Sequence, residues 1–153
     1  MKAKGPTSLT APDRAESLGA LLRRPYTRLQ AHVYGVLAAS GFPEIRPAHS
    51  VVFRHILPEG SRLVELADLA GMTKQSMASL VDYLAIHGYV SVEPDPHDGR
   101  AKRVKLTTQG ERFVAAALAA SKAAEDTLAV ALGRSAIQDL RRLLASVDLA
   151  LAE

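Results

Sequence analysis

The chain has 153 residues, 48% of them hydrophobic, which is enough for one domain of ordinary size with a real core. Its net charge is +3 and its isoelectric point is about 9.4, a mild indication of a polyanionic partner. The absence of cysteine excludes disulfides, thiolate catalysis and cysteine-zinc sites. No signal-peptide core and no bilayer-length apolar run is present, so we expect a soluble, cytoplasmic protein without a membrane partner.

The first third of the chain predicts an arm followed by helices. Residues 1–15 lack hydrophobic periodicity and predict a flexible arm. Apolar residues at helical spacing predict helix over residues 16–39, with Pro25 ending or kinking an early turn. After a loop at residues 40–47, we expect a helix of about three turns that stops at Pro58.

Residues 61–90 have the pattern of a helix-turn-helix. A short amphipathic helix ends at Gly71, and Thr73 is a suitable N-cap for the next helix. Gly88 is the expected C-terminal stop of that second helix. Two short helices joined by a tight turn that contains glycine are typical of a helix-turn-helix.

A β-hairpin is expected directly behind this motif. Residues 89–93 and 103–107 alternate polar and apolar side chains as strands do, and Asp98-Gly99 between them is a turn signal. A helix-turn-helix followed by a hairpin is a winged helix. The tip and second strand of the hairpin carry four basic residues, Arg100, Lys102, Arg103 and Lys105.

The C-terminal third predicts two long helices with extensive apolar faces. Together with the N-terminal helices they exceed what a small domain needs, which favours a layer in which two chains bury one another's faces. The fold class is therefore mainly α with a small β-hairpin wing: a winged helix-turn-helix plus a helical dimerisation layer. The expected parts are the flexible arm (1–15), N-terminal dimerisation helices (16–48), winged helix-turn-helix (49–107) and C-terminal dimerisation helices (108–153).

These elements resemble the multiple antibiotic resistance regulator (MarR) family of bacterial transcription factors. DGRAKRVKLTTQG at residues 98–110 looks like the family's wing, GMTKQSMASLVDYLAIHGYV at 71–90 its recognition helix, and PAHSVVFRHI at 47–56 its second helix. The resemblance runs from about Leu18 to the C-terminus. It implies a homodimer that reads a pseudo-palindromic operator in double-stranded DNA and usually represses transcription until a small ligand weakens binding.

The start and polar face of the recognition helix carry the candidate major-groove contacts. A glutamine can bond adenine through both amide groups, so Gln75 is the best candidate for a base contact. Family members often carry arginine where this sequence has Ser79 and Tyr83, which lowers the positive charge of the helix. A solvated polar helix face is the simpler alternative. The candidates are Thr73, Lys74, Gln75, Ser76 and Ser79.

The basic hairpin supplies the candidate minor-groove and phosphate contacts. An arginine at a hairpin tip can enter a narrow minor groove, and Arg100 is that candidate. Lys102, Arg103 and Lys105 are expected to face phosphates. By resemblance, Asp98 braces the wing by pairing with a nearby arginine. The alternative is a solvated basic hairpin that protects a sheet edge from aggregation.

The resemblance also places a ligand crevice between the dimerisation layer and the DNA-binding region. His32, Tyr34, His49 and Phe53 lie on the helices that line it in the family. A small aromatic or phenolic acid suits histidine and tyrosine with apolar walls. The alternative is that these side chains are ordinary hydrogen-bonded core.

Other function classes find little support in the sequence. The histidines lack the spacing of a metal site, so neither a metal nor another cofactor is expected. Without a glycine-rich nucleotide loop, a cysteine nucleophile or an evident Ser-His-Asp set, an enzyme is not expected either. The remaining alternative is a winged-helix protein-interaction module without operator binding, for which an uncharged wing would be typical.

Overall fold

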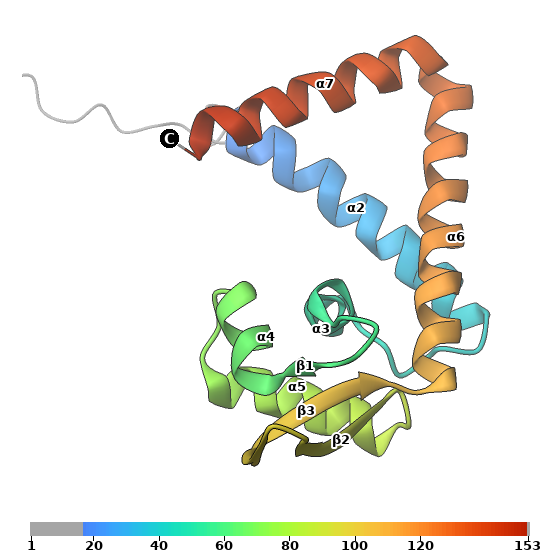
Figure 1. The fold of residues 1–153 in the computed structure, drawn as a ribbon. Helices are drawn as coiled ribbons and strands as arrows, with labels where there is room; N and C mark the ends of the chain where they lie inside the picture. Colours follow the sequence, from blue (N-terminus) through green and yellow to red (C-terminus); the bar gives the residue numbers. More distant parts are fainter. Residues whose placement is uncertain (1–16, 153) are drawn as a thin grey trace, which may run out of the picture.

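The structure, a computed structural model, describes residues 17–152 and consists of a small sheet with short helices at one end and three long helices at the other (Figure 1). The predicted arm at 1–15 lies outside the described residues. No helix within the described part is long and apolar enough to cross a membrane. The elements are α2 (Leu18–Ala39), η1 (Pro47–His49), α3 (Ser50–His55), β1 (Ser61–Arg62), α4 (Leu63–Leu69), α5 (Lys74–Ile86), β2 (Val90–Asp95), β3 (Asp98–Leu106), α6 (Thr108–Leu132) and α7 (Arg134–Leu151).

Helix α2 is continuous, whereas the sequence predicted a break or kink at Pro25. It is capped by Ser17, whose side chain accepts a hydrogen bond from the backbone N–H of Ala20. Pro25 removes one backbone donor near the start of the helix. The later turns continue the helix because Val33 and Leu37 pack into the core.

The helix expected up to Pro58 is shorter than predicted. A 3-10 turn, η1, leads into α3, which ends at His55. The chain then bends toward β1, because the backbone N–H of Leu57 donates to the Ser61 hydroxyl at 3.0 Å.

Helices α4 and α5 form the predicted helix-turn-helix. The Thr73 hydroxyl accepts from the backbone N–H of Ser76 at 3.1 Å, which confirms the predicted cap. Helix α5 ends at Ile86, and Gly88 follows with φ of +78°, a conformation that favours glycine. Side chains with no exposed surface join these helices to α3 and the sheet: Val52, Leu66, Met77, Leu84 and Val104.

The sheet has three antiparallel strands in the order β1-β3-β2, and β1 was not predicted. It contributes a two-residue pairing, Ser61 with Val104 and Arg62 with Arg103. The hairpin reverses at Pro96-His97, two residues before the predicted Asp98-Gly99 turn.

The position of this turn has a local cause. One carboxylate oxygen of Asp95 accepts from the backbone N–H groups of His97 and Asp98, at 2.8 and 3.2 Å. These bonds close the chain reversal directly after β2. Gly99 therefore lies in β3 instead of at the turn.

The three long helices leave much of their apolar surface uncovered. Helix α6 rises from the end of the sheet and α7 turns back from its far end (Figure 1), after a break at Gly133 with φ of +92°. Helix α2 packs against α6, but α7 contributes no buried residue. Exposed apolar side chains on these helices include Leu18, Leu21, Tyr26, Val36, Leu118, Val130, Leu132, Leu140, Leu143, Leu144, Leu149 and Leu151.

Candidate nucleic-acid interface

One face of α5 is exposed along its whole length. Gln75, Ser79, Asp82 and Ile86 recur at helical spacing on that face. The opposite side of the helix is packed in the core. Helix α5 is therefore held firmly from behind and presents a polar stripe at its N-terminal half, as a helix that enters a DNA groove requires.

The five predicted residues at the start of α5 fall into two groups. The Thr73 hydroxyl donates to the Ser76 hydroxyl at 2.9 Å, and the Ser79 hydroxyl donates to the carbonyl of Gln75 at 3.1 Å, so these three hydroxyl groups are engaged within the helix. The side chains of Lys74 and Gln75 are exposed and make no hydrogen bond or ion pair within residues 17–152. Their donors are available to a ligand.

The alternation of β3 divides the four basic residues of the hairpin between two faces. Arg100 and Lys102 are exposed, and neither side chain has an ion-pair partner within residues 17–152. Lys105 lies on the other face, where its Nζ is 2.9 Å from a carboxylate oxygen of Glu93. Two of the four charges are therefore free and one is paired across the hairpin.

The fourth, Arg103, has a structural role, which corrects the expectation that it faces phosphates. Its Nη1 donates to the carbonyl of Gly60 at 3.1 Å, and its Nε and Nη2 donate to Asp95 at 3.1 and 2.9 Å. Its side chain is only 19% exposed. The reason is the register of the sheet, which puts Arg103 beside Arg62 of β1, a strand the sequence did not reveal.

Asp95 is the centre of this arrangement. Its carboxylate has no exposed surface and accepts from Nε and Nη2 of Arg62 at 3.0 and 3.2 Å, as well as from Arg103. The hydrogen bonds from Arg62 hold the pKa of Asp95 well below its usual range, with contributions from the backbone N–H of His97 and from Arg103, although burial opposes them. The hairpin is thus clamped to β1 by a carboxylate that stays ionised at neutral pH.

The bracing role predicted for Asp98 therefore belongs to Asp95. Asp98 makes no ion pair with an arginine within the described part of the chain, and its Oδ1 accepts from the backbone N–H of Arg100 at 3.1 Å. It is exposed at the start of β3 and helps to shape the hairpin. The true pair joins residues 33 positions apart, so no local pattern could have identified it.

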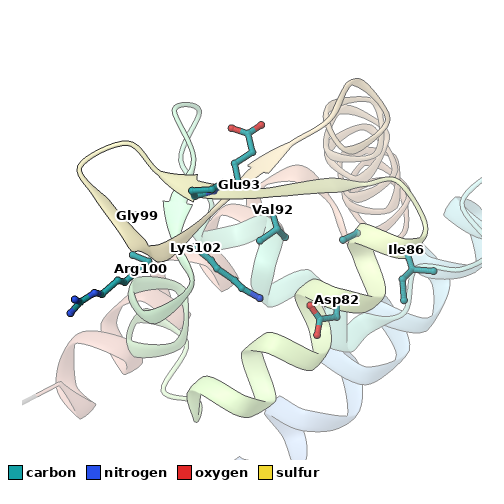
Figure 2. A pocket seen from close by; sticks show the side chains of 10 residues that line it. Asp82, Ile86, Val92, Glu93, Gly99, Arg100 and Lys102 are labelled. Carbon is teal, nitrogen blue, oxygen red and sulfur yellow. The ribbon is translucent and has the colours of Figure 1, made fainter.

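A groove of about 690 Å³ separates α5 from the hairpin (Figure 2). Arg100 and Lys102 line it from the hairpin, and Asp82 and Ile86 line it from the helix. In Figure 2 the Lys102 side chain extends into the space between hairpin and helix, while Arg100 points outward at the hairpin end. The free cations thus lie beside the exposed stripe of α5, in a position to hold a polyanion that follows both.

A second hollow of about 350 Å³ lies between α2, α3 and α6. Tyr34 and Phe53 line it, as predicted for a ligand crevice. His32 and His49 do not: His32 is exposed elsewhere on α2, and His49 is buried against α5. The expectation that all four side chains share one crevice is therefore wrong for the two histidines.

The polar groups of this cavity are few. Burial raises the pKa of Tyr34, so its phenol stays protonated at neutral pH and can donate a hydrogen bond. Arg54 supplies the positive charge of the lining, and Gln30 Nε2 donates to the Tyr26 hydroxyl at 3.1 Å. The spacing of Gln30 and Tyr34, four residues apart on α2, was a usable signal that the sequence reading missed.

No metal centre is evident in the described part of the chain. Within residues 17–152, no three histidine, aspartate or glutamate side chains gather closely enough to hold a metal ion.

A helix-turn-helix backed by a three-stranded sheet with a basic hairpin defines a winged-helix protein. Residues 45–101 match a sequence model described as the MarR family. Over this segment, and in the overall fold reported below, the chain is similar to winged-helix regulators of the MarR family.

Solved structures of transcriptional regulators resemble the chain over most of its length. The transcriptional repressor CouR, bound to a 23-mer DNA duplex, is 26% identical over 93% of this chain and 99% of its own, with a TM-score of 0.71. A MarR-family regulator from Rhodococcus sp. RHA1 is 25% identical over 92% and 96%, with a TM-score of 0.68. CouR from Rhodococcus jostii RHA1 bound to p-coumaroyl-CoA is 25% identical over 87% and 92%, with a TM-score of 0.66.

Proposed function

We propose that this protein is a homodimeric DNA-binding transcriptional regulator, a repressor that releases a pseudo-palindromic operator when a small ligand binds. The observation that carries the proposal is the groove between α5 and the hairpin, where Arg100 and Lys102 are free beside the exposed stripe of the helix. The DNA-bound structure of CouR, which this chain resembles over 93% of its length, supports the same use of the fold.

Each part of the interface has a distinct task in this proposal. The N-terminal half of α5 enters the major groove, where Gln75 bonds an adenine and Lys74 a guanine or a phosphate. Arg100 reaches into the neighbouring minor groove, where a narrow A·T-rich stretch concentrates negative potential. Lys102 holds the phosphate backbone between the two grooves.

The long helices provide the dimer. Helix α7 buries no side chain within its own chain, although its leucines form an apolar face. A second copy of the chain can cover that face together with the exposed apolar residues of α2 and α6, because identical surfaces meet across a two-fold axis. The dimer then presents two α5 helices to half-sites about one helical turn, roughly 10 bp, apart.

The cavity between α2, α3 and α6 is the proposed ligand site. Its volume of about 350 Å³ falls within the range of small-molecule pockets, roughly 300–1,000 Å³. Arg54 can pair with the carboxylate of a small aromatic or phenolic acid while Tyr34 donates to it and Phe53 packs on its ring. A differential affinity of about 1–3 kcal/mol between the two states of the dimer is enough to regulate binding.

Selection of genomic DNA fragments followed by gel-shift titration tests the proposal. We expect a preferred inverted repeat whose affinity falls steeply with added salt, because phosphate contacts release counterions. Arg100→Ala weakens binding by roughly tenfold and makes the salt dependence shallower. Arg142→Ala removes the same charge from exposed α7 and serves as the matched control.

Two results would contradict the proposal. Equal affinity of the wild type and Arg100→Ala would remove the wing from the interface. A flat salt response, or no duplex bound at low ionic strength, would identify a protein-interaction module instead of an operator-binding protein.

A further inference from the structure

Three aromatic rings stack where η1 meets the C-terminal end of α5. The His49 ring lies 4.5 Å from the Tyr83 ring, centroid to centroid, with an angle of 16° between their planes. The Tyr83 ring lies 4.2 Å from that of His87, at 30°. His49 is only 6% exposed. The stack therefore fixes the end of the recognition helix to the turn that begins α3.

Hydrogen bonds determine the protonation of the two imidazoles. Nδ1 of His49 accepts from the backbone N–H of Arg46 at 3.0 Å, so this ring is neutral with its proton on Nε2. Nδ1 of His87 is 2.8 Å from the carbonyl oxygen of Tyr83. Because a carbonyl only accepts, His87 carries a proton on Nδ1. The observed stack thus requires an unprotonated Nδ1 on His49.

Within residues 17–152, no acidic group is found to offset the positive charges that act on His49. Burial lowers the pKa of His49, and the charges of Arg46 and His87 lower it further. On the α5 side it faces the neutral phenol of Tyr83. Glu44 is close in the chain, but its carboxylate accepts from the Tyr89 hydroxyl at 3.0 Å.

The same short segment also forms a wall of the cavity. Helix α3 begins directly after His49, and its residues Ser50, Phe53 and Arg54 line the hollow between α2, α3 and α6. Tyr83 adds a second tie on the other side, since its hydroxyl donates to the carbonyl of Glu44 at 3.1 Å. The stacked rings therefore lie between the cavity wall and the end of α5.

We propose that the His49–Tyr83–His87 stack couples the cavity wall to the recognition helix, and that protonation of His49 releases this coupling and weakens operator binding. The inference rests on the proposed function. A proton on Nδ1 opposes the N–H of Arg46, so the hydrogen bond is lost and the ring leaves the stack.

The direction of the pH effect follows from the same bond. Because the pKa of His49 is lower in the folded protein, the neutral ring contributes stability above the ordinary histidine value of about 6.5. That contribution is lost as the pH falls through the lower, folded value. Added positive charge alone would tighten binding to DNA. A loss of affinity at acidic pH therefore reports the coupling and not the charge.

The first arm of the experiment measures affinity for the best duplex from the genomic selection, at pH 7.5 and 5.5 and constant ionic strength. We expect the wild type to bind roughly tenfold more weakly at pH 5.5, a typical size for coupling between sites. His49→Phe keeps a stacking ring that cannot titrate, and we expect it to lose this pH dependence. His55→Gln, on the far end of α3, is the control and keeps it.

The second arm needs no DNA. Backbone amide shifts of Lys74–Ile86 are followed by NMR in the free protein from pH 7.5 to 5.5, in the wild type and in His49→Asn, whose amide oxygen can still accept from Arg46. We expect the shifts to move with a midpoint below about 6.5 in the wild type only. This arm also decides the case if His49→Phe fails to fold.

The outcomes separate the two proposals. Amide shifts of α5 that do not move in the wild type, or that move equally in His49→Asn, overturn the coupling. An identical loss of affinity in the wild type and His49→Phe also overturns it. Failure to bind any duplex at either pH, with α5 shifts that still depend on His49, overturns the proposed function and leaves the coupling standing.

Discussion

The DNA-reading part of the chain, residues 47–106, and the helical layer formed by α2, α6 and α7 are built to different standards of closure. In the reading part, Met77 and Val104 have no exposed surface, and the charged network around Asp95 is saturated with hydrogen bonds. In the layer, Leu143 is 61% and Leu149 72% exposed. One region completes its core within a single chain, and the other does not.

This difference indicates where the second copy of the proposed dimer packs. Exposed apolar surface is worth about 25 cal/mol per Å² when it is removed from water, so a helix of uncovered leucines favours association. In the reading part the core side chains are already buried, and the exposed apolar residues Leu57, Val64, Leu69 and Ile86 are spread over several elements. In the proposed dimer the two chains therefore meet through the layer, which leaves both α5 helices free.

The largest effect expected from breaking this division is on the dimer. Leu143→Glu places a charge on the apolar face of α7, and symmetry removes two leucines from each interface, roughly 3–6 kcal/mol. We expect dimerisation to weaken by roughly a thousandfold, measured by sedimentation equilibrium. Ser146→Glu, also exposed on α7, is the matched control and should remain dimeric. An unchanged mass for Leu143→Glu would show that α7 lies outside the interface.

The next effect concerns the closed region. Asp95→Asn leaves the guanidinium groups of Arg62 and Arg103 without their shared counter-charge, so the hairpin detaches from β1. We expect operator affinity to fall by roughly a hundredfold while the dimer persists, measured by fluorescence anisotropy and sedimentation. The comparison variant Asp98→Asn loses only an exposed charge, because its amide oxygen can still accept from the backbone N–H of Arg100, and it should bind nearly normally. A stronger defect in Asp98→Asn would restore the bracing role to that residue.

A smaller effect sharpens the role of the exposed stripe of α5. Gln75→Ala removes a bidentate base contact, which discriminates by about 1–3 kcal/mol, so preference should relax at one base position in each half-site. Selection from a random duplex pool measures this directly. Lys74→Ala, the neighbouring variant, should weaken all sequences alike if that side chain contacts phosphate. An unchanged sequence preference in Gln75→Ala would exclude it from base readout.

The smallest effect separates the two faces of β3. Lys105 already pairs with Glu93 at an exposed site, and such pairs contribute about 0–1 kcal/mol, so Lys105→Ala should change operator affinity less than about twofold. Lys102→Ala should remove one phosphate contact and lower the salt slope by about 0.9. Gel-shift titrations at several salt concentrations distinguish them. Equal slopes for both variants would mean that the alternation of the strand does not sort these charges.

Local signals in the sequence were sufficient for most elements. Thr73 was identified as the cap of α5 and Gly88 as its end, because capping and positive φ depend on residues within a few positions. Strand β1 was missed because two residues carry no periodicity of their own.

The site was predicted less completely for the same reason. Residues that act from one face of one element, such as Gln75 and Arg100, could be proposed from their position in a helix or a hairpin. Asp95 was overlooked in favour of Asp98, since the choice depends on which carboxylate meets Arg62 across the sheet. His49 was assigned to the cavity because its side of η1 cannot be read from spacing.

By itself, the sequence determined the order of the helices, the hairpin, the basic charge of its tip and the apolar faces of the outer helices. These features depend on periodicity, capping and turn chemistry within a few residues. Only the tertiary structure decided which charges are free and which are locked, and which rings stack on α5. Those outcomes depend on strand register and on contacts between distant segments, where a change of one residue in register exchanges the two faces of a strand.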